Sequence, residues 1–178
     1  MMRLIHIVGR QNNGKTTLIV ELIAELTKRG FRVGTLKHSS HTHELDRPGK
    51  DSYLHRTAGA CPAAVAAKDL MAVYLPRQPE ENPLDRLAPL FEHVDLVLVE
   101  GYHSGPGKKV EVWRASVGTT PLFSERNDID AVITDDAVAT RLPVWPRSGI
   151  TAIADNIIKE LSLSESRDSR CQEYDHEN

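Results

Sequence analysis

Residues 4–26 read LIHIVGRQNNGKTTLIVELIAEL, and this stretch decides the fold of the chain. A short apolar run is followed by a turn rich in Gly and Asn, and then by apolar residues at helical spacing. The turn, Gly9–Thr16, fits the pattern G-x-x-x-x-G-K-[ST] of the phosphate-binding P-loop. The alternative interpretation is a turn that only joins two packed elements. The order of strand, turn and helix around the pattern favours the P-loop.

The residue types in this loop suit phosphate chemistry. Gly9 and Gly14 allow tight turns that bring backbone N–H groups close to an anion. Lys15 supplies a positive charge for the β- and γ-phosphates, and the Thr16 hydroxyl is suited to bind Mg²⁺. A helix that begins near Lys15 directs its positive end at the same phosphates. The loop residues that we predict to bind the nucleotide are Gly9, Arg10, Asn12, Asn13, Gly14, Lys15, Thr16 and Thr17.

Length and composition predict one globular domain over residues 1–163, since the chain has 178 residues and 40% of them are hydrophobic. The net charge of −3 gives no indication of a nucleic-acid partner, and no apolar run is long enough to span a membrane. The two cysteines, Cys61 and Cys171, do not suggest a structural disulfide, so we expect a cytoplasmic protein. Residues 164–178 are polar and charged, which predicts a disordered tail.

Apolar runs bounded by turn signals predict the order of the elements. Strands are expected over residues 4–8, 31–36, 94–100, 109–113 and 131–134, and helices from residue 15 to 28 and over 51–60, 84–91 and 151–161. The first strand, helix and second strand predict a right-handed crossover and a parallel strand pair. Residues 61–75 suggest a hairpin around Lys68. The fold class is therefore α/β: a mostly parallel P-loop NTPase sheet flanked by helices, with a small β-hairpin extension.

An acidic partner for the P-loop is expected at the end of a neighbouring strand, where a carboxylate supports Mg²⁺. In HVDLVLVEG the candidates are Asp95 and Glu100. Glu100 follows the apolar run, at the sheet edge that also carries the P-loop. Asp95 precedes the run and is about 16 Å away along the strand, at roughly 3.3 Å per residue. We therefore predict Glu100 as the metal-supporting acid, the alternative being a residue that only ends the strand.

The loop that follows the second strand, KHSSHTHELDRPGK over residues 37–50, carries His38, His41, His43, Glu44 and Asp46. Three interpretations are open: a switch loop that senses phosphate and Mg²⁺, an ordinary surface loop, and a Zn or Ni site. The position beside a P-loop favours the switch loop.

Three segments, GRQNNGKTT, KHSSHTHELDRPGKDSYLHRTAGA and DLVLVEGYH, strongly resemble MobB-type proteins, the molybdopterin-guanine dinucleotide biosynthesis adaptor family. The resemblance runs from about Arg3 to about Leu161. The middle block, from Lys37-His38 to Ala60, is its most distinctive part. A P-loop alone would indicate only the superfamily.

The resemblance implies a homodimeric P-loop GTPase of the SIMIBI class that binds GTP with Mg²⁺ and hydrolyses it weakly. It also implies an adaptor for the MobA-type guanylyltransferase, which attaches GMP to molybdopterin, and molybdopterin itself is a further candidate ligand. Matched by position, Lys37 and His38 join the nucleotide-binding residues. Thr16, Asp46 and Glu100 become the metal site, with Asp46 and Glu100 as the catalytic candidates. Tyr102-His103 stands where the family often has Phe-Lys.

Base recognition is weakly marked, since the guanine signature Asn-Lys-x-Asp is absent from the sequence. Asp135 and Asp136 are either purine-reading acceptors or turn residues. Arg10 is either exposed or an arginine finger that reaches a partner protomer, and exposure is favoured. Two rival functions remain open: a small-molecule or nucleotide kinase, and a GTPase-type Ni or Zn chaperone that uses the His cluster and Cys61.

Overall fold

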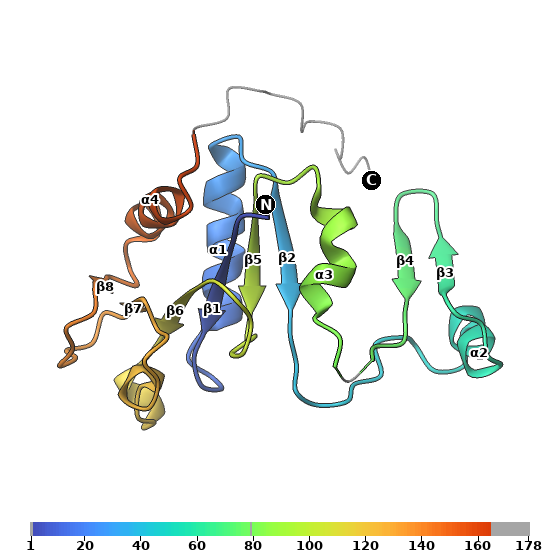
Figure 1. Cartoon of the computed structure of the whole chain (residues 1–178), viewed down its shortest axis with the longest axis horizontal. Helices are drawn as coiled ribbons and strands as arrows, with labels where there is room; N and C mark the ends of the chain where they lie inside the picture. The colour runs from blue at the N-terminus through green and yellow to red at the C-terminus, as the bar shows by residue number, and fades with distance from the viewer. Residues whose placement is uncertain (1, 79, 165–178) are drawn as a thin grey trace. The chain divides into compact units, whose positions relative to one another are not determined.

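The computed structural model describes residues 2–78 and 80–164, and these form two compact units. The larger unit contains the described residues up to Ser39 and from Ala88 onward, and the smaller unit is Ser40–Leu87. The larger unit begins with strand β1 (Leu4–Val8), the phosphate loop and helix α1 (Lys15–Lys28) (Figure 1). Helix α1 ends where the sequence predicts, because Gly30 adopts a left-handed φ of 86° just beyond the C-cap Arg29.

A six-stranded sheet with the order β2-β5-β1-β6-β7-β8 forms the larger unit, and all of its strand pairs are parallel. The predicted α/β fold is thereby confirmed. The remaining strands are β2 (Val33–Lys37), β5 (Leu96–Glu100), β6 (Lys108–Val112), β7 (Ala131–Ile133) and β8 (Val144–Trp145). The expected direct pairing of the first two strands is wrong, because β5 lies between β1 and β2 and pairs with both.

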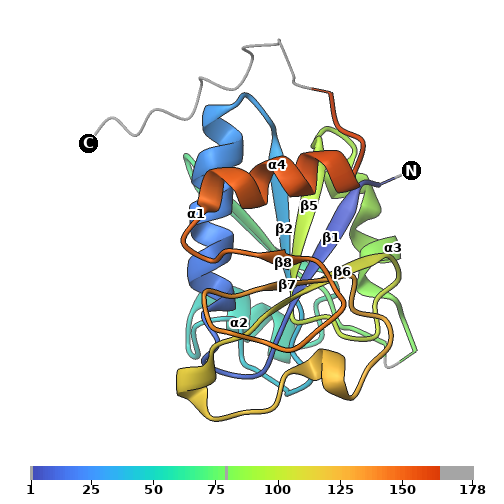
Figure 2. The ribbon, with the colours of Figure 1, turned by 90° about the vertical axis from the view of Figure 1, so that its left-hand side faces the viewer.

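One face of this sheet carries the main hydrophobic core. The alternate strand residues Ile5, Ile7, Leu96 and Leu98 are buried together with Leu18, Leu22 and Leu26 of α1 and Ile153 and Ile157 of α4 (Ile150–Glu160). Helices α1 and α4 contact each other on this face, and α4 crosses α1 at a steep angle (Figure 2). Since successive residues of a strand point to opposite faces, the other face receives His6, Val8 and Glu111.

The segment between β6 and β7 lies over that other face, where Leu122 and Ile129 pack against Val8. It contains two short 3₁₀ helices, η2 (Ala115–Val117) and η3 (Leu122–Ser124), which the sequence does not predict. The buried carboxylate of Glu111 accepts hydrogen bonds from the backbone N–H groups of Leu122, at 2.6 Å, and Phe123, at 2.9 Å. Burial raises the pKa of Glu111, and these two hydrogen bonds oppose that effect.

The smaller unit contains helix α2 (Asp51–Thr57), strands β3 (Ala63–Ala66) and β4 (Met71–Tyr74), and helix α3 (Pro83–Leu87). Strands β3 and β4 pair antiparallel, which confirms the predicted hairpin. The helix expected over 84–91 is two pieces: α3, followed in the larger unit by the 3₁₀ helix η1 (Ala88–Phe91), which contains Pro89. None of the described helices combines the length and apolar character needed to cross a membrane.

The predicted single domain over 1–163 stays a prediction, and the predicted disordered tail lies outside the described residues from position 165 onward.

The parallel sheet matters for function because it brings the carboxyl ends of six strands to one edge. In open α/β sheets ligands bind at this edge.

Candidate functional site

The phosphate loop connects β1 to α1 at the carboxyl edge of the sheet, and its backbone requires glycine at both ends. Gly9 has a φ of 144°, and a Cβ atom there would lie 2.4 Å from the carbonyl oxygen of Val112 on β6. Gly14, the N-cap of α1, has a φ of 87°. The N-terminal N–H groups of α1 therefore begin directly at the loop, where they favour an anion.

Lys15, the first residue of α1, folds back over the loop. Its ammonium group donates hydrogen bonds to the carbonyl oxygens of Gly9 and Arg10, both at 2.9 Å. Burial lowers the pKa of Lys15; the nearby Glu100 carboxylate raises it, and Lys37 lowers it again. This cation is held inside the loop, where phosphates would be bound.

Asn13 holds the loop from within. Its side chain is fully buried, donates to the carbonyl oxygen of Arg10 at 3.3 Å and accepts from the backbone N–H of Arg114 at 2.8 Å. The Asn13 side chain already makes hydrogen bonds within the chain, so the predicted contact of Asn13 with a nucleotide would be made by its backbone N–H group.

Glu100, at the carboxyl end of β5, lies beside the loop, as the strand pattern predicts. Its carboxylate accepts a hydrogen bond from the Thr16 hydroxyl at 2.8 Å and is 3.3 Å from the ammonium group of Lys37. The Glu100 side chain is only 12% exposed. A hydroxyl and a carboxylate oxygen in contact are ligand types that Mg²⁺ takes in proteins, so Thr16 and Glu100 fit this ion. Asp95, at the opposite end of the strand, instead binds Arg32.

The residues after β2 are tied to the end of β5. The backbone N–H of His38 donates to the carbonyl oxygen of Glu100 at 2.8 Å. The His38 ring stacks on Tyr102, with 4.3 Å between ring centroids and 16° between planes. Lys37, His38 and Glu100 thus lie together with Thr16 at one side of the loop.

Arg10 contacts its own chain in this structure. Its Nε atom donates to the carbonyl oxygen of Thr120 at 2.9 Å, and its guanidinium forms an ion pair with Glu125. These contacts join the phosphate loop to the segment that follows β6.

Other predicted site residues belong to the smaller unit. There the Asp46 carboxylate accepts hydrogen bonds from the N–H of Arg47, at 2.8 Å, and the hydroxyl of Ser52, at 3.1 Å, while Glu44 pairs with Arg56 at 2.6 Å. The rings of His41 and His43 are 6.3 Å apart. Within residues 2–78 and 80–164, no group of three or more His, Cys, Asp or Glu side chains is arranged to hold a metal ion.

Asp135 and Asp136 follow strand β7, which lies on the opposite side of β1 from β5 and Glu100. Asp135 accepts from both the N–H and the hydroxyl of Ser148, each at 3.0 Å, and Asp136 accepts from the N–H of Ala115 at 2.8 Å. Both carboxylates therefore hold neighbouring loops together. These contacts are typical of turn residues, and a role of either carboxylate in reading a purine stays a prediction.

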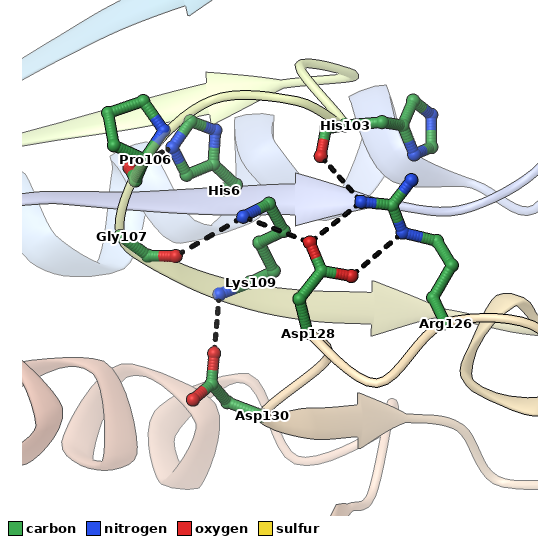
Figure 3. A network of polar contacts seen from close by, with 8 residues as sticks. All are labelled: His6, His103, Pro106, Gly107, Lys109, Arg126, Asp128 and Asp130. Atoms are coloured by element: carbon green, nitrogen blue, oxygen red, sulfur yellow. Dashed lines mark hydrogen bonds and ion pairs between the residues drawn. The ribbon is translucent and has the colours of Figure 1, made fainter.

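A polar network, which the sequence analysis does not predict, holds the segment after Glu100 in place (Figure 3). Arg126 pairs with Asp128 at 2.7 Å and donates to the carbonyl oxygen of His103 at 2.9 Å. Asp128 also lies 3.3 Å from the ammonium group of Lys109, whose side chain is only 7% exposed. The guanidinium of Arg126 is the largest cause that holds the pKa of Asp128 well below its ordinary value.

His6, in the middle of β1, belongs to the same region. It is fully buried, and its Nε2 atom lies 2.8 Å from the carbonyl oxygen of Pro106, so Nε2 carries the proton. The usable signal for this network was His6, a polar residue in the otherwise apolar strand β1. Its register partner Lys109 lies in β6, which also carries Lys108 and Glu111.

Stability is expected to fall below pH 6.5 through His6. Burial lowers the pKa of His6 from 6.5, a hydrogen bond to Pro106 opposes this, and Lys109 lowers it further. The unfolded chain then binds a proton before the folded chain does, so the contribution is fully present above pH 6.5 and is lost as pH falls toward the folded pKa. His6→Gln keeps a donor for Pro106 without titrating.

Urea unfolding at pH 7.5 and pH 5.5 measures this effect. We expect the loss of unfolding free energy in the native chain to exceed that in His6→Gln by up to about 1.4 kcal/mol. His103, whose pKa is also lowered, mainly by burial, contributes in the same direction, so His103→Gln is the second variant. The exposed His43→Gln is the control. Equal losses in the native chain and His6→Gln would contradict the assignment.

Comparison with known proteins agrees with this geometry. The model of one protein family, described as Molybdopterin guanine dinucleotide synthesis protein B, matches residues 4–135. The chain is 33% identical to the Molybdopterin-guanine dinucleotide biosynthesis adapter protein of Escherichia coli over 165 residues, covering 89% of this chain and 93% of the relative. It is 38% identical to the protein of the same name from Haemophilus influenzae over 143 residues, covering 79% and 76% of the two chains.

Solved structures give the same result. The crystal structure of a MobB protein homolog from Bacillus stearothermophilus superposes with a TM-score of 0.62 at 28% identity, covering 90% of this chain and 99% of that one. Fold, phosphate loop and sequence similarity agree over most of the chain. The chain therefore belongs to the family of molybdopterin guanine dinucleotide synthesis protein B.

Proposed function

We propose that this chain is a GTP-binding adaptor that assists a MobA-type guanylyltransferase in making the guanine dinucleotide form of the molybdenum cofactor. The names of its relatives support the adaptor role, since the similar proteins of Escherichia coli and Haemophilus influenzae are biosynthesis adapter proteins for molybdopterin-guanine dinucleotide. The observation that carries nucleotide binding is the contact of Thr16 with Glu100 at 2.8 Å, directly beside the Lys15 loop.

In this proposal the chain's own groups bind the nucleotide as follows. Backbone N–H groups of the loop and the N-terminus of α1 receive the phosphate oxygens, and Lys15 neutralises the terminal phosphates. Thr16 and Glu100 would hold Mg²⁺, which neutralises phosphate charge when bound. Lys37 and His38, tied to Glu100, are placed to respond to the state of the phosphates. Asp46 stays a sequence-based prediction, because it belongs to the smaller unit.

Weak GTP hydrolysis, a homodimer and a cytoplasmic location are further parts of the proposal, supported by the resemblance of the P-loop, the loop after β2 and the β5 end to MobB-type proteins. The resemblance also suggests molybdopterin as a ligand. For an adaptor, binding of the partner in response to GTP would be sufficient, without a requirement for GTP hydrolysis.

Capture of a MobA-type guanylyltransferase by this chain tests the proposal. The chain is immobilised and incubated with the partner in the presence of Mg²⁺ with GTP, with ATP or without nucleotide. We expect more capture with GTP than with ATP. A chain that binds neither nucleotide in calorimetry, or that captures no guanylyltransferase under any condition, would overturn the proposal.

A further inference from the structure

Arg114 lies directly against the phosphate loop. It stands two residues beyond the end of β6, and its backbone N–H donates to the buried Asn13 side chain at 2.8 Å. Its guanidinium lies against Gly14: a Cβ atom on Gly14 would be 2.6 Å from one terminal nitrogen of Arg114 and 3.0 Å from Cζ. The side chain is half-buried. A cation is therefore placed at the N-terminus of α1, the end that attracts anions.

The other arginines around the loop have acidic partners. Arg10 pairs with Glu125, Arg126 with Asp128, and Arg147 with Glu21. In the part of the chain that the structure describes, the guanidinium of Arg114 makes no hydrogen bond and no ion pair, although its charge helps to lower the pKa of Glu21, the partner of Arg147. A guanidinium presents five N–H donors in a planar fork that matches phosphate oxygens, so Arg114 can still take up such a ligand.

The sheet order shows on which side of the loop Arg114 lies. Strands β5 and β6 flank β1 on opposite sides. Glu100 and Thr16, which fit the metal and terminal phosphates, lie on the β5 side, whereas Arg114 comes from the end of β6. A nucleotide whose terminal phosphates face Glu100, and which continues along the strand order, would have its α-phosphate and nucleoside toward β6, β7 and β8.

We infer that Arg114 is a nucleotide-binding residue that holds the α-phosphate. This inference rests on the proposed function, because it assumes that the loop binds a nucleotide. Arg114 adds a cation that the loop pattern does not contain, at the opposite end of the phosphate chain from the Thr16–Glu100 pair. Both nucleoside di- and triphosphates carry the α-phosphate, so the contact is independent of the γ-phosphate.

Calorimetry with GTP and GDP tests this inference in the native chain, Arg114→Ala and Arg114→Lys. We expect Arg114→Ala to weaken both nucleotides by a similar factor, about 10- to 100-fold, as for the loss of charged hydrogen bonds. Arg114→Lys keeps the charge and should recover part of the affinity. Arg32→Ala removes an arginine that pairs with Asp95, distant from Glu100, and is the matched control.

The two diastereomers of the α-phosphorothioate of GTP distinguish direct contact of Arg114 with the α-phosphate from an indirect effect of Arg114 on the packing of the phosphate loop. A fork bound to the α-phosphate distinguishes the two isomers, so the difference in their affinities should shrink in Arg114→Ala. An unchanged isomer difference, or unchanged affinity for GTP and GDP, would overturn the inference. A change confined to the preference for GTP over ATP would assign Arg114 to the base instead. Failure of the native chain to bind any nucleotide would reject the proposed function itself.

Discussion

Lys15→Ala is expected to weaken GTP binding by about 100- to 1,000-fold, which corresponds to roughly 3–4 kcal/mol. The variant loses a cation from the phosphates together with the donor that bonds the Gly9 and Arg10 carbonyl oxygens at 2.9 Å. Alanine is a strong helix former, so α1 itself should tolerate the change. Calorimetric titration with GTP in the presence of Mg²⁺ measures the effect.

Lys28→Ala is the matched control, because Lys28 ends the same helix and the substitution removes the same charge and side chain. Its affinity for GTP should equal that of the native chain. If Lys15→Ala binds GTP as tightly as Lys28→Ala, the loop is not the phosphate site. The fold of both variants is checked by thermal unfolding.

Gly9→Ala is expected to destabilise the chain by about 3–5 kcal/mol and to abolish GTP binding. Two effects combine at Gly9: its φ of 144° is one that side chains rarely adopt, and the new Cβ would lie 2.4 Å from the backbone oxygen of Val112. Strand β6 cannot move away easily, because it pairs with β1 along its length. A loss of this size lowers the midpoint of thermal unfolding by roughly 10 °C in a chain of this length.

Gly118→Ala separates the two effects. Gly118 also has a left-handed φ, 71°, but nothing lies within 4 Å of the position of its Cβ. This variant should lose only about 1–2 kcal/mol and keep its affinity for GTP. Thermal unfolding of the three chains is the measurement. A similar fall in Gly9→Ala and Gly118→Ala would show that close approach to β6 contributes little.

The sequence predicted those parts of the fold and site that have local signals. The β1 run, the glycine turn and the apolar stripe of α1 are contiguous, so their type and order could be assigned from spacing alone. Glu100 was placed beside the loop because a parallel strand ends at the same edge as its neighbours. The contact of Glu100 with Thr16 agrees with that expectation.

The remaining features depend on contacts between distant segments. Strand β8 contains only Val144 and Trp145, too short a run to show a period. The insertion of β5 between β1 and β2 joins residues more than 60 positions apart. Arg114 resembled any surface arginine, although its position just after a strand end was a usable signal. The role of Arg114 can be inferred only from its closeness to Gly14 and from the ion pairs of the other arginines.

The hydrogen bonds of Lys15 and Asn13 within the phosphate loop have a kinetic consequence. These bonds fix the loop backbone through the chain's own groups, so association of a ligand requires little reorganisation of the chain. When a binding surface is formed in advance, differences in affinity among related ligands are expressed mainly in how fast each one dissociates. GTP and its competitors should therefore enter this loop at similar rates and differ in residence time.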